Sequence, residues 1–320
     1  MGAMTPQPSG LEQIVWTALE RGEIEPATAI NGIESGLPGG AAALVPFTSH
    51  PVAAVRLAAS GALERCRREP PRLVFTLLGG FSVFRGSWQA DDAAWERRVA
   101  QRLVRFLLLQ RSHVVSEDEI LEALWPERPA DGARRSLHVA VSRARAVLDT
   151  PRAPSVIESA DRMYRLRLRP GDSVDADEFE TTAHVALTAH GVARMRVLER
   201  AASLWGGEPL PEERYADWAL GWREQLTDLY AAVLTALADA CLERGDLTAA
   251  ELHARGLVEL DPLNEGAHRR LMVVYARTGR RNRALRQFLA CRRTLVEQLG
   301  VEPATETAHL QQRILAGEPV

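Results

Sequence analysis

Lysine is absent from this chain of 320 residues, and all 39 of its basic side chains are arginine. A nucleotide-binding P-loop places a lysine on the phosphates, so the sequence excludes a standard P-loop. Schiff-base catalysis needs a lysine amine and is excluded for the same reason.

Cysteine is scarce, with Cys66, Cys241 and Cys291 far apart along the chain. An odd number of widely spaced cysteines favours neither a disulfide framework nor a metal knuckle. We therefore expect reduced thiols that serve as small buried side chains in a cytoplasmic protein. No apolar run approaches the roughly 20 residues of a membrane span, and the N-terminus lacks a signal-peptide pattern. We expect no membrane partner.

Catalytic and metal-binding motifs are also missing. His184 and His190 do not share a helix face, and no HExxH, GxSxG or paired ligand spacing occurs. The sequence therefore predicts no enzymatic activity, no cofactor and no metal site.

Positive charge is concentrated in the middle of the chain. The net charge is −3, yet residues 72–170 hold 17 arginines against 12 acidic residues, and both flanks are acidic. Such an excess suggests a polyanionic partner for this segment, although a solvated charged surface would give the same count.

The middle segment begins with two β-rich runs around Gly79-Gly80, which predict a hairpin. A helix is expected over 95–110, where apolar residues recur at helical spacing. Ser116 and Glu119 form a capping box that starts a second helix, and this helix stops at Pro126.

Asp131 is the expected cap of a third, amphipathic helix. Its predicted buried stripe consists of Leu137, Val141, Ala144 and Leu148. The opposite side carries Arg135, His138, Ser142 and Arg143, with Arg134 and Arg145 at the borders. Arginine pairs bidentately with guanine and neutralises phosphates, so this helix suits a DNA major groove. A plain solvated surface helix is the alternative.

Residues 155–169 predict a second hairpin, with a turn near Asp161 and strict alternation from Tyr164. A hairpin directly after an arginine-bearing helix is typical of a wing. The arginines Arg162 and Arg165 belong to this hairpin and could reach a neighbouring groove.

This order of elements resembles the OmpR-type winged helix. The stretch SLHVAVSRARAVLD is similar to the family's recognition helix, and IESADRMYRL to its wing. The resemblance implies DNA contacts for Arg135, Arg143 and Arg145. The sequence departs from the pattern at Met163, where the family has glycine, and at Ala160, where it has a wing arginine. The candidate DNA-binding residues are Arg134, Arg135, His138, Ser142, Arg143, Arg145, Arg162 and Arg165.

The segment 171–320 is expected to be helical throughout and contains a repeat of 34 residues typical of tetratricopeptide repeats. The matching pairs are Leu237 and Leu271, Gly245 and Gly279, and Ala250 and Ala284. Thr248 and Glu251 predict a capping box for the second helix of the repeat. Stacked helix pairs leave a surface for partners, although the repeat could be purely structural.

Four stretches resemble the bacterial transcriptional activator domain: DADEFE, LWGGEPLPEERYADWA, DPLNEGAHRRLMVVYARTGRRNRALRQF and EQLGVEPATETAHLQQRIL. That domain follows an OmpR-type winged helix in the Streptomyces antibiotic regulatory protein family. The resemblance covers residues 72–316.

The first segment, 1–71, is expected to be helical over 11–21 and 26–35, with a HEAT-type hairpin over 40–68. In that hairpin Pro51 opens a helix, and the side chains predicted to pack inward are Val55, Leu57, Ala58 and Leu63. The segment either packs on the winged helix or ends a longer regulator whose sensor lies upstream.

We therefore predict a mainly helical protein with a small β component. A short helical segment (1–71) precedes a winged helix (72–170) and a tetratricopeptide-like activator domain (171–320). The predicted function is sequence-specific binding of promoter DNA to activate transcription. The resemblance implies direct repeats, a dimer or pair of protomers, contact with RNA polymerase, and control of secondary-metabolite genes such as those of antibiotic biosynthesis. The alternative is an interaction adaptor whose winged helix contacts protein.

Overall fold

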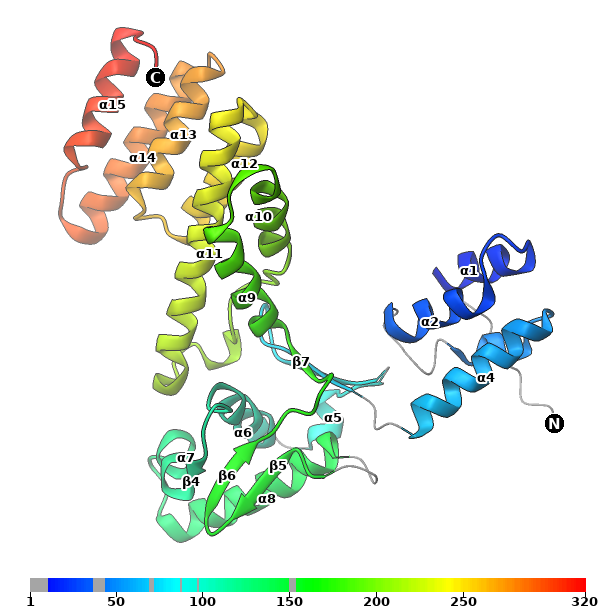
Figure 1. Ribbon diagram of the computed structural model, residues 1–320. Coiled ribbons are helices and arrows are strands. Elements are labelled where there is room, and N and C mark those ends of the chain that lie inside the picture. The colour runs from blue at the N-terminus through cyan, green and yellow to red at the C-terminus, as the bar shows by residue number, and fades with distance from the viewer. Residues whose placement is uncertain (1–10, 37–43, 69–71, 87, 97, 150–153) are drawn as a thin grey trace. The chain divides into compact units, whose positions relative to one another are not determined.

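The computed structural model describes residues 11–36, 44–68, 72–86, 88–96, 98–149 and 154–320. Helices dominate these residues, and the strands form two small sheets (Figure 1), which confirms the predicted fold class. The chain divides into two compact units, each described by itself. No helix in the described ranges is both long enough and apolar enough to cross a membrane.

The N-terminal helices share an apolar core. They are α1 (Leu11–Glu20), α2 (Pro26–Gly36) and α4 (Ala53–Arg68), with the short 3-10 helix η1 (Pro46–Ser49). Trp16 lies against the rings of Phe47 and His50, with ring centroids 5.4 and 4.4 Å away. Other fully buried members of this core are Ile30, Ile33, Leu44, Val55 and Ala59.

The predicted packing of α4 is wrong at one position. Leu57 is 78% exposed, whereas Val55 is buried together with Ala59 and Ala62. These three residues follow helical spacing and define the inward side, so Leu57 points away from it. Part of the predicted hairpin, residues 40–43, lies outside the described residues, as does the side chain of Cys66.

A four-stranded sheet opens the winged helix. Its order is β3 (Trp88–Gln89), β2 (Ser82–Arg85), β1 (Leu73–Thr76) and β7 (Ser173–Val174). Strands β1 and β2 are antiparallel, which confirms the hairpin predicted around Gly79-Gly80. Strand β7 pairs in parallel with β1, so the expectation that 171–320 is helical throughout is wrong at its start.

Four helices follow: α5 (Asp92–Trp95), α6 (Arg98–Leu109), α7 (Glu117–Leu124) and α8 (Ala130–Leu148). The helix predicted from residue 95 is shorter than expected, because the chain turns at Glu96, where φ is 53°. Helix α7 has the predicted capping box of Ser116 and Glu119. Asp131 lies in the first turn of α8 and does not cap it, since the N-cap position is Pro129.

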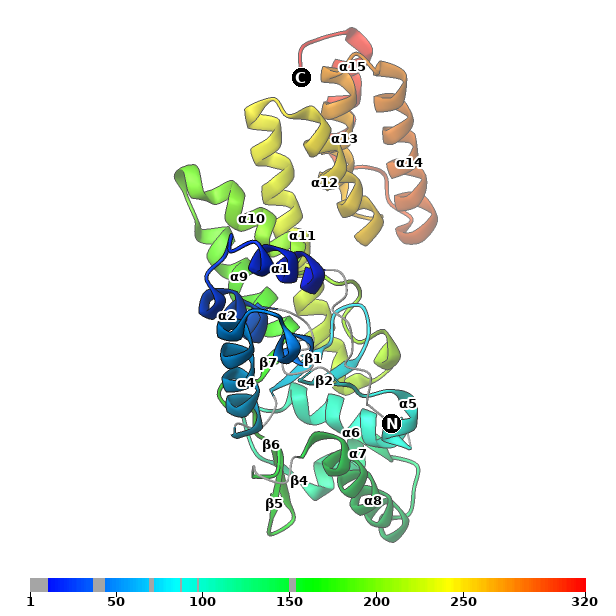
Figure 2. The same cartoon turned by 90° about the vertical axis from the view of Figure 1, so that its right-hand side faces the viewer.

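The second sheet contains the wing. Its order is β4 (Val115–Ser116), β6 (Met163–Leu166) and β5 (Ile157–Ala160). Strands β5 and β6 form the predicted hairpin (Figure 2). In its register Ala160 lies opposite Met163. Tyr164 and Leu166 are buried, which confirms the alternation, although the strand ends at Leu166.

The second unit consists mainly of stacked helices. In chain order these are α9 (Asp175–Thr188), η2 (Gly191–Ala193), α10 (Arg194–Ser203), η3 (Pro211–Glu213), α11 (Asp217–Arg244), α12 (Leu247–Leu260), α13 (Glu265–Arg277), α14 (Arg281–Leu299) and α15 (Thr305–Ala316). Figure 1 shows α12, α13 and α14 side by side.

The 34-residue repeat corresponds to equivalent structural positions. Gly245 and Gly279 have φ of 76° and 72° and follow the ends of α11 and α13. Both positions favour glycine because φ is positive. Leu237, Leu271, Ala250 and Ala284 are buried, as the repeat predicts. Cys241 and Cys291 are buried and free, as expected.

The capping box predicted for α12 is wrong. Helix α12 begins at Leu247, and its N-cap is Asp246, whose side chain accepts a hydrogen bond from the Ala249 amide at 3.0 Å. Glu251 instead forms ion pairs with Arg255 and Arg280. The helix starts two residues earlier than expected because Asp246 follows Gly245 directly and caps better.

Two glycine-containing segments of the second unit approach each other closely. The Gly79 amide donates to the Glu208 carbonyl at 2.9 Å. A Cβ atom on Gly79, where φ is 79°, would lie 2.3 Å from the Gly206 carbonyl oxygen. The position therefore requires glycine for both its backbone conformation and its space.

Candidate nucleic-acid interface

Helix α8 is amphipathic in the way the sequence predicts. Leu137, Val141, Ala144 and Leu148 are each at most 5% exposed and anchor one side of the helix. This anchoring turns the opposite side outward. The exposed polar residues there are Arg135, His138, Ser142 and Arg143.

Arg135 and Ser142 are unengaged within the part of the chain that the structure describes. Both side chains are exposed and form no hydrogen bond or ion pair there. A guanidinium without a protein partner keeps all its donors for a ligand. These two residues therefore fit the predicted role of contacting bases or phosphates.

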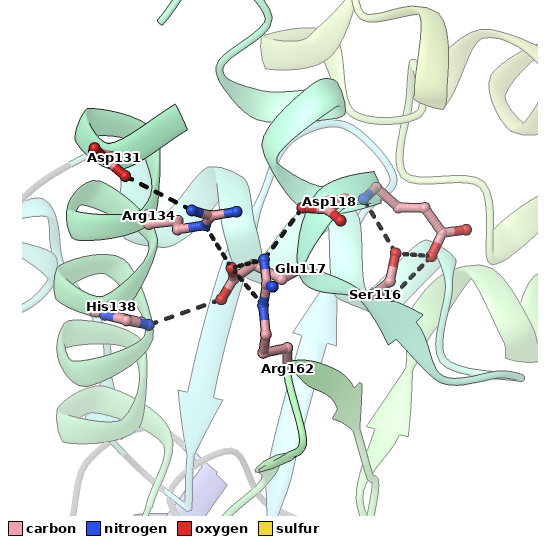
Figure 3. A network of polar contacts seen from close by, with 8 residues as sticks. Ser116, Glu117, Asp118, Asp131, Arg134, His138 and Arg162 are labelled. Carbon is pink, nitrogen blue, oxygen red and sulfur yellow. Dashed lines mark hydrogen bonds and ion pairs between the residues drawn. The ribbon is translucent and has the colours of Figure 1, made fainter. Parts of the chain in front are cut away.

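Glu117 joins helix α8 to the β5–β6 wing (Figure 3). Its side chain is only 5% exposed, and one carboxylate oxygen accepts hydrogen bonds from Arg134 at 3.0 Å and from Arg162 at 3.0 and 2.8 Å. The second oxygen lies 3.9 Å from Nε2 of His138. Three candidate DNA-binding side chains from two elements thus meet at one acid.

The two neighbouring arginines stabilise the negative charge of the Glu117 carboxylate. Burial raises the pKa of Glu117, but the hydrogen bonds and positive charges of Arg162 and Arg134 outweigh it. The pKa of Glu117 therefore lies below its ordinary value of 4.5. The carboxylate is ionised at neutral pH and holds both guanidinium groups.

The wing turn depends on the same acid. Asp161 and Arg162 have φ of 50° and 61°, a left-handed two-residue turn that suits a hairpin. Non-glycine residues pay about 1 kcal/mol or more each for this conformation. Besides its side-chain contacts, Glu117 donates its amide to the Arg162 carbonyl at 2.8 Å, which helps to hold the turn.

Arg143 and Arg145 differ in their surroundings. Arg143 forms an ion pair with Glu96 at 2.7 Å, with both side chains about half exposed. Such a pair contributes about 1 kcal/mol or less, so a phosphate could displace it. Arg145 donates to the Ile157 carbonyl at 3.1 and 2.7 Å and to the Ser159 hydroxyl at 2.8 Å. Its guanidinium is turned onto strand β5.

Arg165 lies at a hollow on the wing. It lines a pocket with Glu158, Met163 and Tyr164, and its Nε atom is buried without a hydrogen-bond partner. The neighbouring Arg167 is exposed and pairs with Glu158 at 3.4 Å. Arg165 is therefore less accessible than the alternation of the strand suggests.

Sequence reasoning missed Glu117 and Glu96 as partners of the arginines. Glu117 stands between Ser116 and Asp118, in a stretch that reads simply as a capping box. The local sequence of the capping box gives no sign of a partner 45 residues away.

The family comparisons match both parts of the chain. Residues 98–166 match the family described as Transcriptional regulatory protein, C terminal, and residues 174–315 match the Bacterial transcriptional activator domain. The chain is 31% identical over 261 residues to the Regulatory protein AfsR of Streptomyces coelicolor, covering 78% of this chain and 25% of AfsR. It thus spans about a quarter of AfsR.

Shorter relatives are matched over more of their length. The Transcriptional regulatory protein MoaR1 of Mycobacterium tuberculosis is 28% identical, over 68% of this chain and 72% of MoaR1. A solved structure of Mycobacterium tuberculosis EmbR, in complex with a low-affinity phosphopeptide, is similar with a TM-score of 0.63 and 25% identity. That similarity covers 78% of this chain and 66% of EmbR.

A winged helix followed by a bacterial transcriptional activator domain defines a class of bacterial transcription regulators. Within that class, the chain belongs to the Streptomyces antibiotic regulatory protein family, as the sequence predicts.

Proposed function

We propose that this chain activates transcription by binding double-stranded promoter DNA in a sequence-specific manner. Helix α8 enters the major groove, and the β5–β6 hairpin contacts the neighbouring backbone or minor groove. The observation that carries the proposal is the exposed polar side of α8, held outward by a fully buried stripe on its other side.

The side chains divide into two roles. Arg135, His138, Ser142 and Arg143 are exposed on α8 and read base edges or bind phosphates. Arg134, Arg145 and Arg162 are held by Glu117 or by strand β5, so they position the helix and wing while presenting positive charge. Arg165 contributes charge from the wing.

The domain division into 1–71, 72–170 and 171–320 forms part of the proposal. The winged helix supplies DNA recognition, and the repeat domain contacts RNA polymerase, since stacked helix pairs leave broad surfaces for proteins. Two protomers bind direct repeats near a promoter of secondary-metabolite genes. The match to the Bacterial transcriptional activator domain and the similarity to the Regulatory protein AfsR support a role in transcription.

The experiment is selection of bound sequences from a random pool of duplex DNA, repeated at two salt concentrations. We expect an enriched pair of equally oriented half-sites and an affinity that falls steeply as salt rises, because phosphate contacts release counterions. Recovery of unenriched DNA at both salt concentrations would contradict the proposal and favour the adaptor function.

A further inference from the structure

A small pocket in the repeat domain is surrounded by arginines. It lies among α12, α13 and α14 and has a volume of about 260 Å³. The lining residues are Arg255, Tyr275, Arg283, Arg286 and Gln287. None of them belongs to the candidate DNA-binding set.

Two of these arginines form no close ion pair in the described part of the chain, although Arg283 lies near enough to Glu251 to interact with its charge. Arg283 and Arg286 are exposed on α14 and form no ion pair with any described side chain. Arg286 makes only a long contact, 3.4 Å, with the carbonyl of Asn282 in its own helix. Both guanidinium groups therefore have donors available for a ligand.

The third arginine, Arg255, is held in place by contacts with two neighbouring side chains. Arg255 donates to the hydroxyl of the buried Tyr275 at 3.4 and 3.2 Å and also pairs with Glu251. Glu251 also binds Arg280, whose guanidinium lies 4.9 Å over the Tyr275 ring. Glu251 thus pairs with two arginines, and Glu259 adds a second negative charge near Arg255. The four arginines Arg255, Arg280, Arg283 and Arg286 still outnumber these two acids, so the pocket has an excess of positive charge.

Exposed leucines flank the arginines along the same helices. Leu252 is 68% exposed and stands one turn before Arg255 on α12. Leu289 is 58% exposed and stands one turn after Arg286 on α14. Neither leucine lines the pocket itself, but each lies one helical turn from an arginine that does.

We propose that this pocket is a docking site for an acidic segment of a protein partner. A carboxylate of that segment enters between Arg283 and Arg286, and apolar side chains next to it cover Leu252 and Leu289. A duplex backbone fits less well, because the arginines converge on one hollow and the leucines would have no apolar partner. The proposal stands independently of DNA binding by α8.

The test begins with a random peptide library displayed on phage and selected against the full chain. Peptides that also bind the Arg283→Ala/Arg286→Ala double variant are removed. We expect the remaining peptides to combine Asp or Glu with Leu, Ile or Phe. If no peptide prefers the parent, or the preferred peptides lack acidic residues, the proposal is overturned.

Fluorescence anisotropy with one labelled selected peptide then measures the contribution of the pocket. We expect the Arg283→Ala/Arg286→Ala variant to bind about tenfold or more weakly, as loss of two charge-assisted contacts implies. A matched control is Arg196→Ala/Arg244→Ala, which removes two exposed arginines of α10 and α11 outside the pocket. Equal weakening by both double variants would show a general charge effect and would overturn the site.

Duplex DNA binding separates this proposal from the function of the winged helix. The Arg283→Ala/Arg286→Ala variant should bind a DNA fragment as tightly as the parent while losing the peptide. Loss of DNA affinity together with unchanged peptide binding would assign the pocket to DNA and overturn the proposal. Unfolding curves of the parent and both variants should coincide, because the substituted residues are exposed.

Discussion

Glu117 and Arg162 contact each other through both side chain and backbone. The guanidinium of Arg162 donates to the Glu117 carboxylate at 3.0 and 2.8 Å, and the Glu117 amide donates to the Arg162 carbonyl at 2.8 Å. The first residue of α7 therefore holds the wing turn, and through Arg134 it also contacts α8.

Replacing Glu117 should weaken the winged helix. Glu117→Gln keeps the side-chain size but removes the charge that holds Arg134 and Arg162. We expect a loss of about 1–2 kcal/mol in the free energy of unfolding, limited because both arginines remain partly exposed. Urea unfolding of the parent and the variant measures it. Asp118→Asn is a control, because Asp118 is 79% exposed and should change stability little; equal losses would contradict the special role of Glu117.

The same pair predicts a pH dependence. The pKa of Glu117 is lowered in the folded state, because its hydrogen bonds to Arg162 and Arg134 and their positive charges outweigh the effect of burial. Because this pKa is lowered, the ionised Glu117 carboxylate stabilises the folded state fully at pH values above its ordinary pKa of 4.5. That stabilisation is lost as the pH falls through the lower pKa of the folded state. The stability difference between the parent and Glu117→Gln should therefore shrink in acid. A difference that stays constant with pH would contradict this assignment.

The start of α12 offers a direct comparison of two neighbouring residues. Asp246→Ala removes the side chain that accepts the Ala249 amide, so we expect a loss of about 1 kcal/mol in unfolding free energy. Thr248→Ala, inside the first turn, should cost clearly less. Thermal unfolding of both variants distinguishes them, and a larger loss for Thr248→Ala would restore the cap predicted from sequence.

Gly79 should tolerate no side chain. Gly79→Ala places a Cβ atom 2.3 Å from the Gly206 carbonyl oxygen at a φ of 79°, so backbone has to move. We expect a loss of about 2 kcal/mol or more in unfolding free energy. Gly221→Ala is the control, because a Cβ there meets no atom within 4 Å. If the two variants are equally stable, the close approach of Gly79 and Gly206 is not present in solution.

Periodicity predicted which side of each helix is buried, and it did so best where the stripe is long. All four predicted members of the α8 stripe are buried, although Ala133, Ala140 and Val147 join them. Leu57 was misplaced, because the neighbouring alanines Ala59 and Ala62 supply the contact. Small residues carry little hydrophobic signal, so a sequence pattern undervalues them.

Polar partners were harder to predict, because they come from distant segments. The arginines of α8 and the wing were recognised, but Glu96, Glu117 and the Ile157 carbonyl, which hold four of them, were not. Those contacts depend on how the three helices and the hairpin pack. No local spacing in the sequence encodes that packing.

The most direct test of the account is the base preference of α8 variants. Affinities of the parent, Arg135→Ala and Arg143→Ala are measured for a selected duplex and for a scrambled duplex, with Arg167→Ala as a control outside the helix. We predict that the two α8 variants lose about 1–3 kcal/mol of preference for the selected duplex. Arg167→Ala should keep that preference. Unchanged preference in both α8 variants would contradict the claim that this helix reads DNA.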